Sequence, residues 1–69
     1  MTQKELLYIE DAIGHESNII KICESTIEML EDDALVKFLE KELKKHNSMK
    51  EKLITALEGC TNEWSNTIR

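Results

Sequence analysis

The stretch "MLEDDAL", residues 29–35, separates two long amphipathic segments and decides the fold. Its three consecutive acids, Glu31 to Asp33, favour the start of a helix, because carboxylates cap a first turn and suit the positive end of the helix dipole. Asp32 is therefore the expected N-cap of a second helix. A turn this short makes two helices antiparallel neighbours. The sequence thus predicts an antiparallel helical hairpin.

Before the turn, apolar residues recur at alternating intervals of three and four, the period of one helix face. This row comprises Leu6, Ile9, Ile13, Ile20, Cys23, Ile27 and Leu30, and it is interrupted once, by Glu16. The opening "TQKE", residues 2–5, matches a capping box, in which Thr2 and Glu5 bond reciprocally. We expect one helix over residues 3–30.

After the turn, the same alternation continues in a second row. It comprises Leu35, Leu39, Glu42, His46, Met49, Leu53, Ala56 and Cys60. We expect a helix over residues 33–58, with Gly59 as a left-handed C-terminal cap. Residues 60–69, "CTNEWSNTIR", show no clear period and are predicted to form a short C-terminal extension. Residues 1–59 would then be a single hairpin domain.

Composition agrees with an all-α chain and excludes several classes of function. The 69 residues contain no proline and two glycines, as is typical of long helices with few turns. A net charge of −5 argues against nucleic acid as a partner, since phosphate binding needs a clustered basic surface. No apolar run approaches the roughly 18 residues that a membrane span requires. Cys23 and Cys60 fit no metal-binding or redox spacing, which favours a reducing, cytoplasmic location.

Both helices carry apolar faces wider than a two-helix hairpin covers, which favours a bundle of more helices. The additional apolar residues are Ala12, Ile19, Ile22, Met29, Val36, Leu43, Ile54 and Leu57. Residues 1–33 hold nine acids and two lysines, net −7, whereas residues 34–69 hold five acids and seven bases, net +2. The simplest completion is a second copy of the chain. We therefore expect a homodimer that forms a four-helix bundle, which the family resemblance described below implies to be ferritin-like.

Three polar residues, Glu16, Glu42 and His46, interrupt the apolar rows near mid-helix. Burying an ionised carboxylate is costly unless another group compensates it. A shared metal would do so, since carboxylates and imidazoles are the ligands of di-iron and di-manganese bundles. Hydrogen bonds between Glu and His would also do so and would fix the register. In a third alternative the bundle is offset, and these side chains reach solvent or pair with Lys45 and Lys50.

The segments "TQKELLYIEDAIGHESNIIKICE", "EDDALVKFLEKELKKH" and "NSMKEKLITAL" resemble the coat F family of small proteins from spore-forming bacteria. The resemblance covers about residues 2–57 and implies a ferritin-type hairpin and a location in the cytoplasm or spore coat. Metal-binding ferritin-like proteins use a Glu on one helix and Glu-x-x-His on the next. Glu16 matches the first element, but "ELKKH" is one residue longer than the second, and Lys45 occupies the matching position.

Two functions follow as expectations. In the first, the chain is a non-enzymatic structural or assembly protein that acts as a homodimeric bundle, alone or with other spore coat proteins. In the alternative, Glu16, Glu42 and His46 bind a di-iron or di-manganese centre shared across the dimer, with a role in storage or redox chemistry. A helical module that docks a different partner is a weaker third possibility. Residues for nucleophilic catalysis and a phosphate-binding loop are not evident in the sequence.

Overall fold

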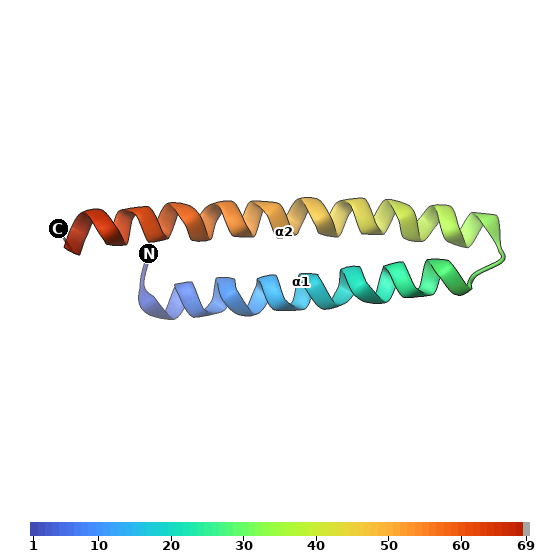
Figure 1. Ribbon diagram of the computed structural model, residues 1–69, viewed down its shortest axis with the longest axis horizontal. Helices are drawn as coiled ribbons and strands as arrows, with labels where there is room; N and C mark the ends of the chain where they lie inside the picture. Colours follow the sequence, from blue (N-terminus) through green and yellow to red (C-terminus); the bar gives the residue numbers. More distant parts are fainter. Residues whose placement is uncertain (69) are drawn as a thin grey trace.

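The computed structural model describes residues 1–68, with side chains through residue 59. It contains two helices, α1 (Gln3–Met29) and α2 (Asp33–Ile68), and the described residues contain no strand. The helices lie side by side and antiparallel, joined by a tight turn over residues 30–32 (Figure 1). The hairpin measures 55 × 15 × 13 Å. The predicted all-α antiparallel hairpin is therefore confirmed.

Both helices begin at the caps that the sequence predicts. The backbone N–H of Glu5 donates to Oγ1 of Thr2 over 3.1 Å, and the N–H of Thr2 donates to Oε1 of Glu5 over 3.1 Å. At the start of α2, the N–H of Leu35 donates to Oδ1 of Asp32 over 3.1 Å. These bonds satisfy N–H groups that have no partner within the helix.

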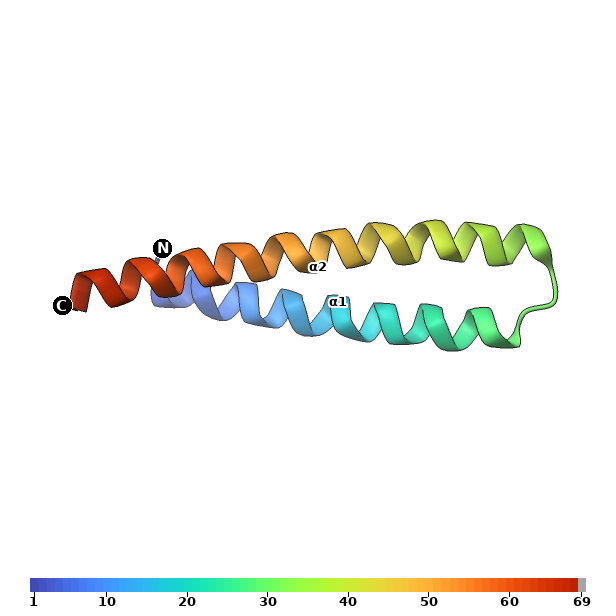
Figure 2. The same ribbon diagram turned by 45° about the horizontal axis from the view of Figure 1, so that its top comes forward.

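The predicted end of the second helix at Glu58 is wrong. Gly59 does not cap the helix, because α2 continues to Ile68 and no glycine of the described chain has a positive φ. A glycine inside a helix costs only about 1 kcal/mol relative to alanine, and no proline follows it. The expected extension of residues 60–69 is therefore helical as far as Ile68. Figure 2 shows α2 reaching beyond the start of α1.

The contact between the helices uses only part of the predicted row of α2, since Leu39, Glu42, His46 and Leu53 are half-buried as expected and residues of the neighbouring row replace the others. On α1 and its C-cap, the predicted apolar row is half-buried or buried and comprises Leu6, Ile9, Ile13, Ile20, Cys23, Ile27 and Leu30, with Ala12 half-buried beside it. On α2, the corresponding residues are Val36, Leu39, Leu43, Leu53, Ile54 and Leu57. Leu35, Met49 and Ala56 were expected in this contact but are exposed. Cys60 lies outside the described side chains.

The physical reason for this shift is that α2 carries two adjacent apolar rows. A heptad pattern identifies residues that share a helix face, but it does not specify which of two neighbouring rows meets α1. The hairpin is consequently poor in buried apolar groups. Among the described side chains, only Glu16 and Cys23 are buried, at 8% and 9% exposure. The hairpin therefore lacks a dry apolar core of its own.

Candidate functional site

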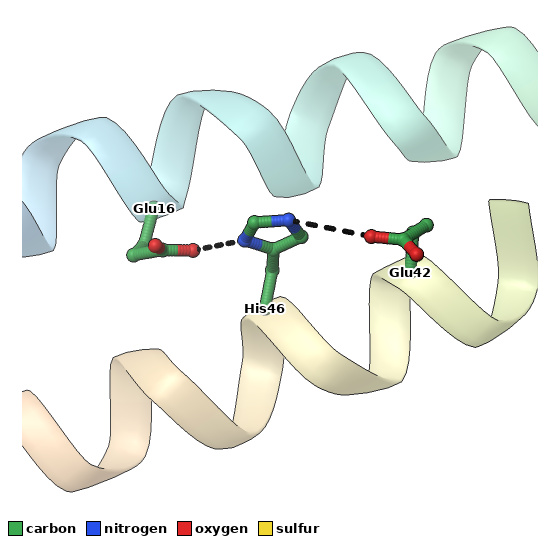
Figure 3. Close-up of polar contacts among 3 residues, drawn as sticks. All are labelled: Glu16, Glu42 and His46. Atoms are coloured by element: carbon green, nitrogen blue, oxygen red, sulfur yellow. Dashed lines mark hydrogen bonds and ion pairs between the residues drawn. The ribbon is translucent and has the colours of Figure 1, made fainter.

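The three residues predicted to form a polar layer are brought together near the middle of the hairpin. Glu16 projects from α1, whereas Glu42 and His46 project from α2, with the imidazole between the two carboxylates (Figure 3). Heptad spacing on both helices and the position of the turn place Glu16 level with His46. The spacing of four residues puts Glu42 and His46 on one face of α2.

The contact between Glu16 and His46 is direct. Nδ1 of His46 lies 2.5 Å from Oε2 of Glu16, and the side chains are 20% and 11% exposed. A carboxylate only accepts hydrogen bonds, so the imidazole donates through Nδ1–H. Hydrogen bonds to an ionised group are shorter and stronger than neutral ones. This bond compensates the most buried carboxylate of the described chain.

Glu42 occupies a different environment on the opposite side of the ring. Its Oε2 lies 3.8 Å from Nε2 of His46, and its side chain is 31% exposed. This separation is too long for a hydrogen bond but close enough for a favourable electrostatic interaction with an imidazolium. Glu42 therefore lies at the edge of the layer, where water still reaches its carboxylate.

Within one hairpin, this arrangement does not fit a metal ion shared by all three residues. Ligand atoms lie about 2.0–2.2 Å from a bound ion, and the direct 2.5 Å contact between Glu16 and His46 leaves no room for one. The two carboxylates also approach opposite nitrogens of the ring (Figure 3). In the described part of the chain, no group of three His, Cys, Asp or Glu residues could hold a metal. A centre shared across two copies stays a prediction.

The remaining candidates from the sequence lie outside the layer. His15, next to Glu16 in the chain, is exposed on a different face of α1. Lys45 is exposed and Lys50 is half-buried. The two ion pairs of the described residues both belong to His46, so neither is formed by a lysine. Of the three alternatives, the hydrogen-bonded layer matches the geometry of the hairpin.

A second feature of the hairpin is a set of exposed apolar residues beside the contact row of each helix. Tyr8 and Phe38 are 60% and 57% exposed, Ile22 is 64% exposed and Met29 is 76% exposed. These residues recur at heptad spacing, interrupted by polar residues, namely His15, Thr26, Glu42, Lys45 and Lys52. The sequence predicts apolar faces wider than a two-helix hairpin covers, and the exposure of Ile22 and Met29 agrees with this; Tyr8 and Phe38 were not among the residues expected there.

The fold and the layer define a class of protein: an antiparallel helical hairpin with a carboxylate–imidazole contact at mid-height. No protein-family model, curated protein or solved structure matches the chain. Within the residues that the structure describes, neither helix is both long and apolar enough to cross a membrane.

Proposed function

We propose that this chain is a non-enzymatic structural protein whose working form is a homodimeric four-helix bundle. The observation that carries the proposal is the open face, defined here as Tyr8, Ala12, Ile19, Ile22, Met29, Leu35, Phe38, Met49 and Ala56. All of these residues are exposed except Ala12, which is half-buried. Exposed apolar surfaces of this extent in a small protein mark sites of association.

The apolar rows of the two helices lie on the same side of the hairpin. On each helix the open row directly precedes a row that contacts the other helix: Ile19 precedes Ile20, and Leu35 precedes Val36. Successive side chains are rotated by about 100° around the helix axis. On both helices the open row is therefore rotated from the contact row in the same sense when each helix is viewed from its N-terminus. Because the helices are antiparallel, rows displaced in the same sense lie on one side of the pair. The open face is therefore a single surface.

The total surface of the hairpin agrees with a missing partner. Its accessible surface is 5661 Å², whereas a compact monomer of 8.0 kDa exposes roughly 4,500 Å². The whole excess is roughly 1,200 Å², and part of it results from the elongated shape of the hairpin. Burying about 1,000 Å² on each of two copies is typical of obligate homodimers.

The polar residues on this side of the hairpin differ in how much free energy their burial in a dimer would cost. The hydroxyl of Thr26, on the open row of α1, donates to the backbone carbonyl of Ile22 over 2.7 Å, so it is already satisfied. His15 lies within the open row of α1, between Ala12 and Ile19.

Glu42 lies within the open row of α2, seven residues from both Leu35 and Met49, and beside His46. In a dimer, Glu42, His46 and Glu16 of both copies would lie at mid-height. Such a layer penalises shifted registers at some cost in stability.

The experiment that tests the proposal is sedimentation equilibrium over a wide range of protein concentrations. We expect a dimer, and we expect Ile22→Glu and Phe38→Glu each to raise the dissociation constant at least tenfold. The loss of a buried Ile or Phe alone removes about 1.5–3 kcal/mol. A wild-type chain that stays monomeric at every concentration would overturn the proposal.

Leu7→Glu provides a matched control. Leu7 is 55% exposed, but it lies on α1 away from both the contact row and the open face. This variant introduces the same charge at an equally exposed apolar position on the same helix. We expect it to dimerise as the wild type does. If all three substitutions weakened the dimer equally, the added negative charge would be the cause, and the open face would not be the site of association.

The proposed biological setting is the spore coat, supported by the resemblance of residues 2–57 to the coat F family. We expect an epitope-tagged chain, produced in a spore-forming bacterium, to be recovered with the coat layers of purified spores. Phe38→Glu should reduce this recovery if the dimer is the form that assembles, and Leu7→Glu should not. If Phe38→Glu and the wild type were recovered equally, the chain would reach the coat without needing to dimerise.

A further inference from the structure

The open face can meet a second copy of itself in two symmetric ways. We infer that α1 of one copy packs over α2 of the second copy, with both turns at the same end of the bundle. This inference rests on the proposed homodimer and specifies its arrangement. A two-fold axis along the hairpin produces it. An axis across the hairpin would instead place α1 over α1 and α2 over α2, with the turns at opposite ends.

The level of each residue along the bundle follows from the contact of Glu16 with His46. In an antiparallel pair, residue i of α1 then lies level with about residue 62 − i of α2. Tyr8 is consequently level with the region of Ala56, and Ala12 with that of Met49, each to within about two residues or 3 Å. The axis along the hairpin preserves these levels between copies.

Side-chain sizes suit this arrangement at the end of the open face far from the turn. Tyr8 is a large side chain near the level of the small Ala56, and Ala12 is a small side chain near the level of the large Met49. Nearer the turn, large residues share a level, since Ile22 lies near the level of Phe38 and Met29 near that of Leu35. Alternation of large and small side chains across facing positions lets layers interdigitate, and this applies to the two layers that contain Tyr8 and Ala12.

Charges on and beside the open face favour the same arrangement. On α2, Lys45 and Lys52 follow Phe38 at seven-residue intervals and Lys41 lies at the outer edge, and all three lysines are exposed. Packing α2 over α2 would bring two such rows together. Packing α1 over α2 places Asp11 of one copy near the level of Lys52 of the other. Each exposed pair contributes little, but arrangements with like charges facing each other are selected against.

The arrangement can be tested by pulsed electron paramagnetic resonance on the full chain. One spin label is attached at Glu31→Cys, beside the turn, and in a separate variant at Gln3→Cys, at the far end of α1. Both positions are exposed and lie away from the open face. Cys23→Ala and Cys60→Ser remove the native thiols, and circular dichroism and sedimentation check that each variant remains a helical dimer.

With the turns at one end, both labels report distances set by the width of a bundle, roughly 10–20 Å between helix axes plus the linkers. With the turns at opposite ends, both labels report distances near the length of α1, roughly 40 Å. Long distances from a sample that sediments as a dimer would overturn the arrangement and leave the proposed function intact. Absence of a dipolar signal together with monomeric sedimentation would overturn both.

If the labelled background fails to fold, the lysines offer a second measurement. Wild-type copies with and without ¹⁵N are mixed and treated with a short lysine-reactive cross-linker. We expect cross-links between copies to join Lys4 to Lys52, which lie at the same end of the bundle. Cross-links between copies that join Lys45 to Lys45 in preference to that pair would overturn the inference.

Discussion

Nδ1 of His46 on α2 lies 2.5 Å from Oε2 of Glu16 on α1, joining residues thirty positions apart at the most buried level of the hairpin. A hairpin with so few buried apolar groups has this polar contact where an apolar contact would be expected. The contact defines the register of the two helices, because a shift by one turn would leave the buried Glu16 without its partner, whereas His46 would keep Glu42 on its own helix.

Removal of either partner should therefore destabilise the fold. We expect Glu16→Ala and His46→Ala each to lower the free energy of unfolding by about 1–3 kcal/mol, the cost of leaving a buried polar group unpaired. The double variant should lose less than the sum of the two. Urea denaturation at one fixed protein concentration measures all three, since the stability of a dimer depends on concentration.

Lys21→Ala is the control for this cycle, since His15 lies on the open row of α1 between Ala12 and Ile19. Lys21 is exposed on α1 and lies on neither the contact row nor the open row, and an exposed substitution of this kind changes stability by less than about 0.5 kcal/mol. If His46→Ala has no larger effect than Lys21→Ala, the contact between Glu16 and His46 does not contribute to stability.

Replacement of both partners by apolar residues should have the opposite outcome. We expect Glu16→Leu with His46→Leu to be as stable as the wild type or more stable, since apolar replacement of a buried ion pair is often neutral or favourable by about 1–4 kcal/mol. The double Leu variant should lose the specificity of its helix register, and the distributions of distances between spin labels should become broader than in the protein with Glu16 and His46. A clearly less stable double Leu variant with sharp distances would show that the layer serves stability and not register.

Metal analysis tests the alternative function. We expect wild-type protein, purified without chelator and then loaded with Fe²⁺, Mn²⁺ or Zn²⁺, to retain less than one ion per dimer after desalting. The reason is that Nδ1 of His46 is already engaged by Glu16. One or two ions per dimer that are lost in Glu42→Gln would contradict this expectation. Glu42 and Nε2 of His46 would then be the ligands, with Glu16 orienting the ring.

Gly14 offers a stabilising substitution. It lies within α1, and a Cβ added there meets nothing within 4 Å. We expect Gly14→Ala to raise the free energy of unfolding by about 0.5–1 kcal/mol, because alanine has the higher helix propensity and restricts the unfolded chain. Thermal denaturation measures the gain. A loss of stability accompanied by weaker dimerisation would show that the second copy approaches the backbone of Gly14 closely.

The capping box predicts a titration that can be followed at one residue. A backbone hydrogen bond from Thr2, aided by the Thr2 side chain, lowers the pKa of Glu5 below its ordinary value. Since the folded pKa is the lower one, the stabilisation is present above the unfolded pKa and is lost as the pH falls through the folded pKa. Carboxyl NMR should show Glu5 titrating below 4.5, and higher in Thr2→Ala. An identical pKa in both proteins would contradict the coupling.

Local chemistry made the helix starts predictable from the sequence. Thr2 with Glu5, and Asp32 with Leu35, bond within three residues of each other, so no information about the rest of the fold is needed. The end of α2 was not predictable in this way. Gly59 permits a helix to stop but does not require it, and its φ is not positive; α1, by contrast, ends without a glycine, at Leu30 in an extended conformation.

The contact between Glu16 and His46 was also accessible from the sequence, because the position of the turn fixes which residues are level. The difference in environment between Glu16 and Glu42 was not. It depends on which row of α2 meets α1, and the neighbouring apolar rows that contain Leu35 and Val36 are equally regular in the sequence. Packing between the helices decides between them.

The apolar residues that hold α1 against α2 are distinct from those that form the open face: Ile20 belongs to one set and Ile19 to the other. Evolution could therefore exchange residues of the open face one by one, and so redirect the hairpin from its own copy to a paralogue, without disturbing the fold. Duplicated genes of this kind would yield a set of mixed bundles from a single scaffold.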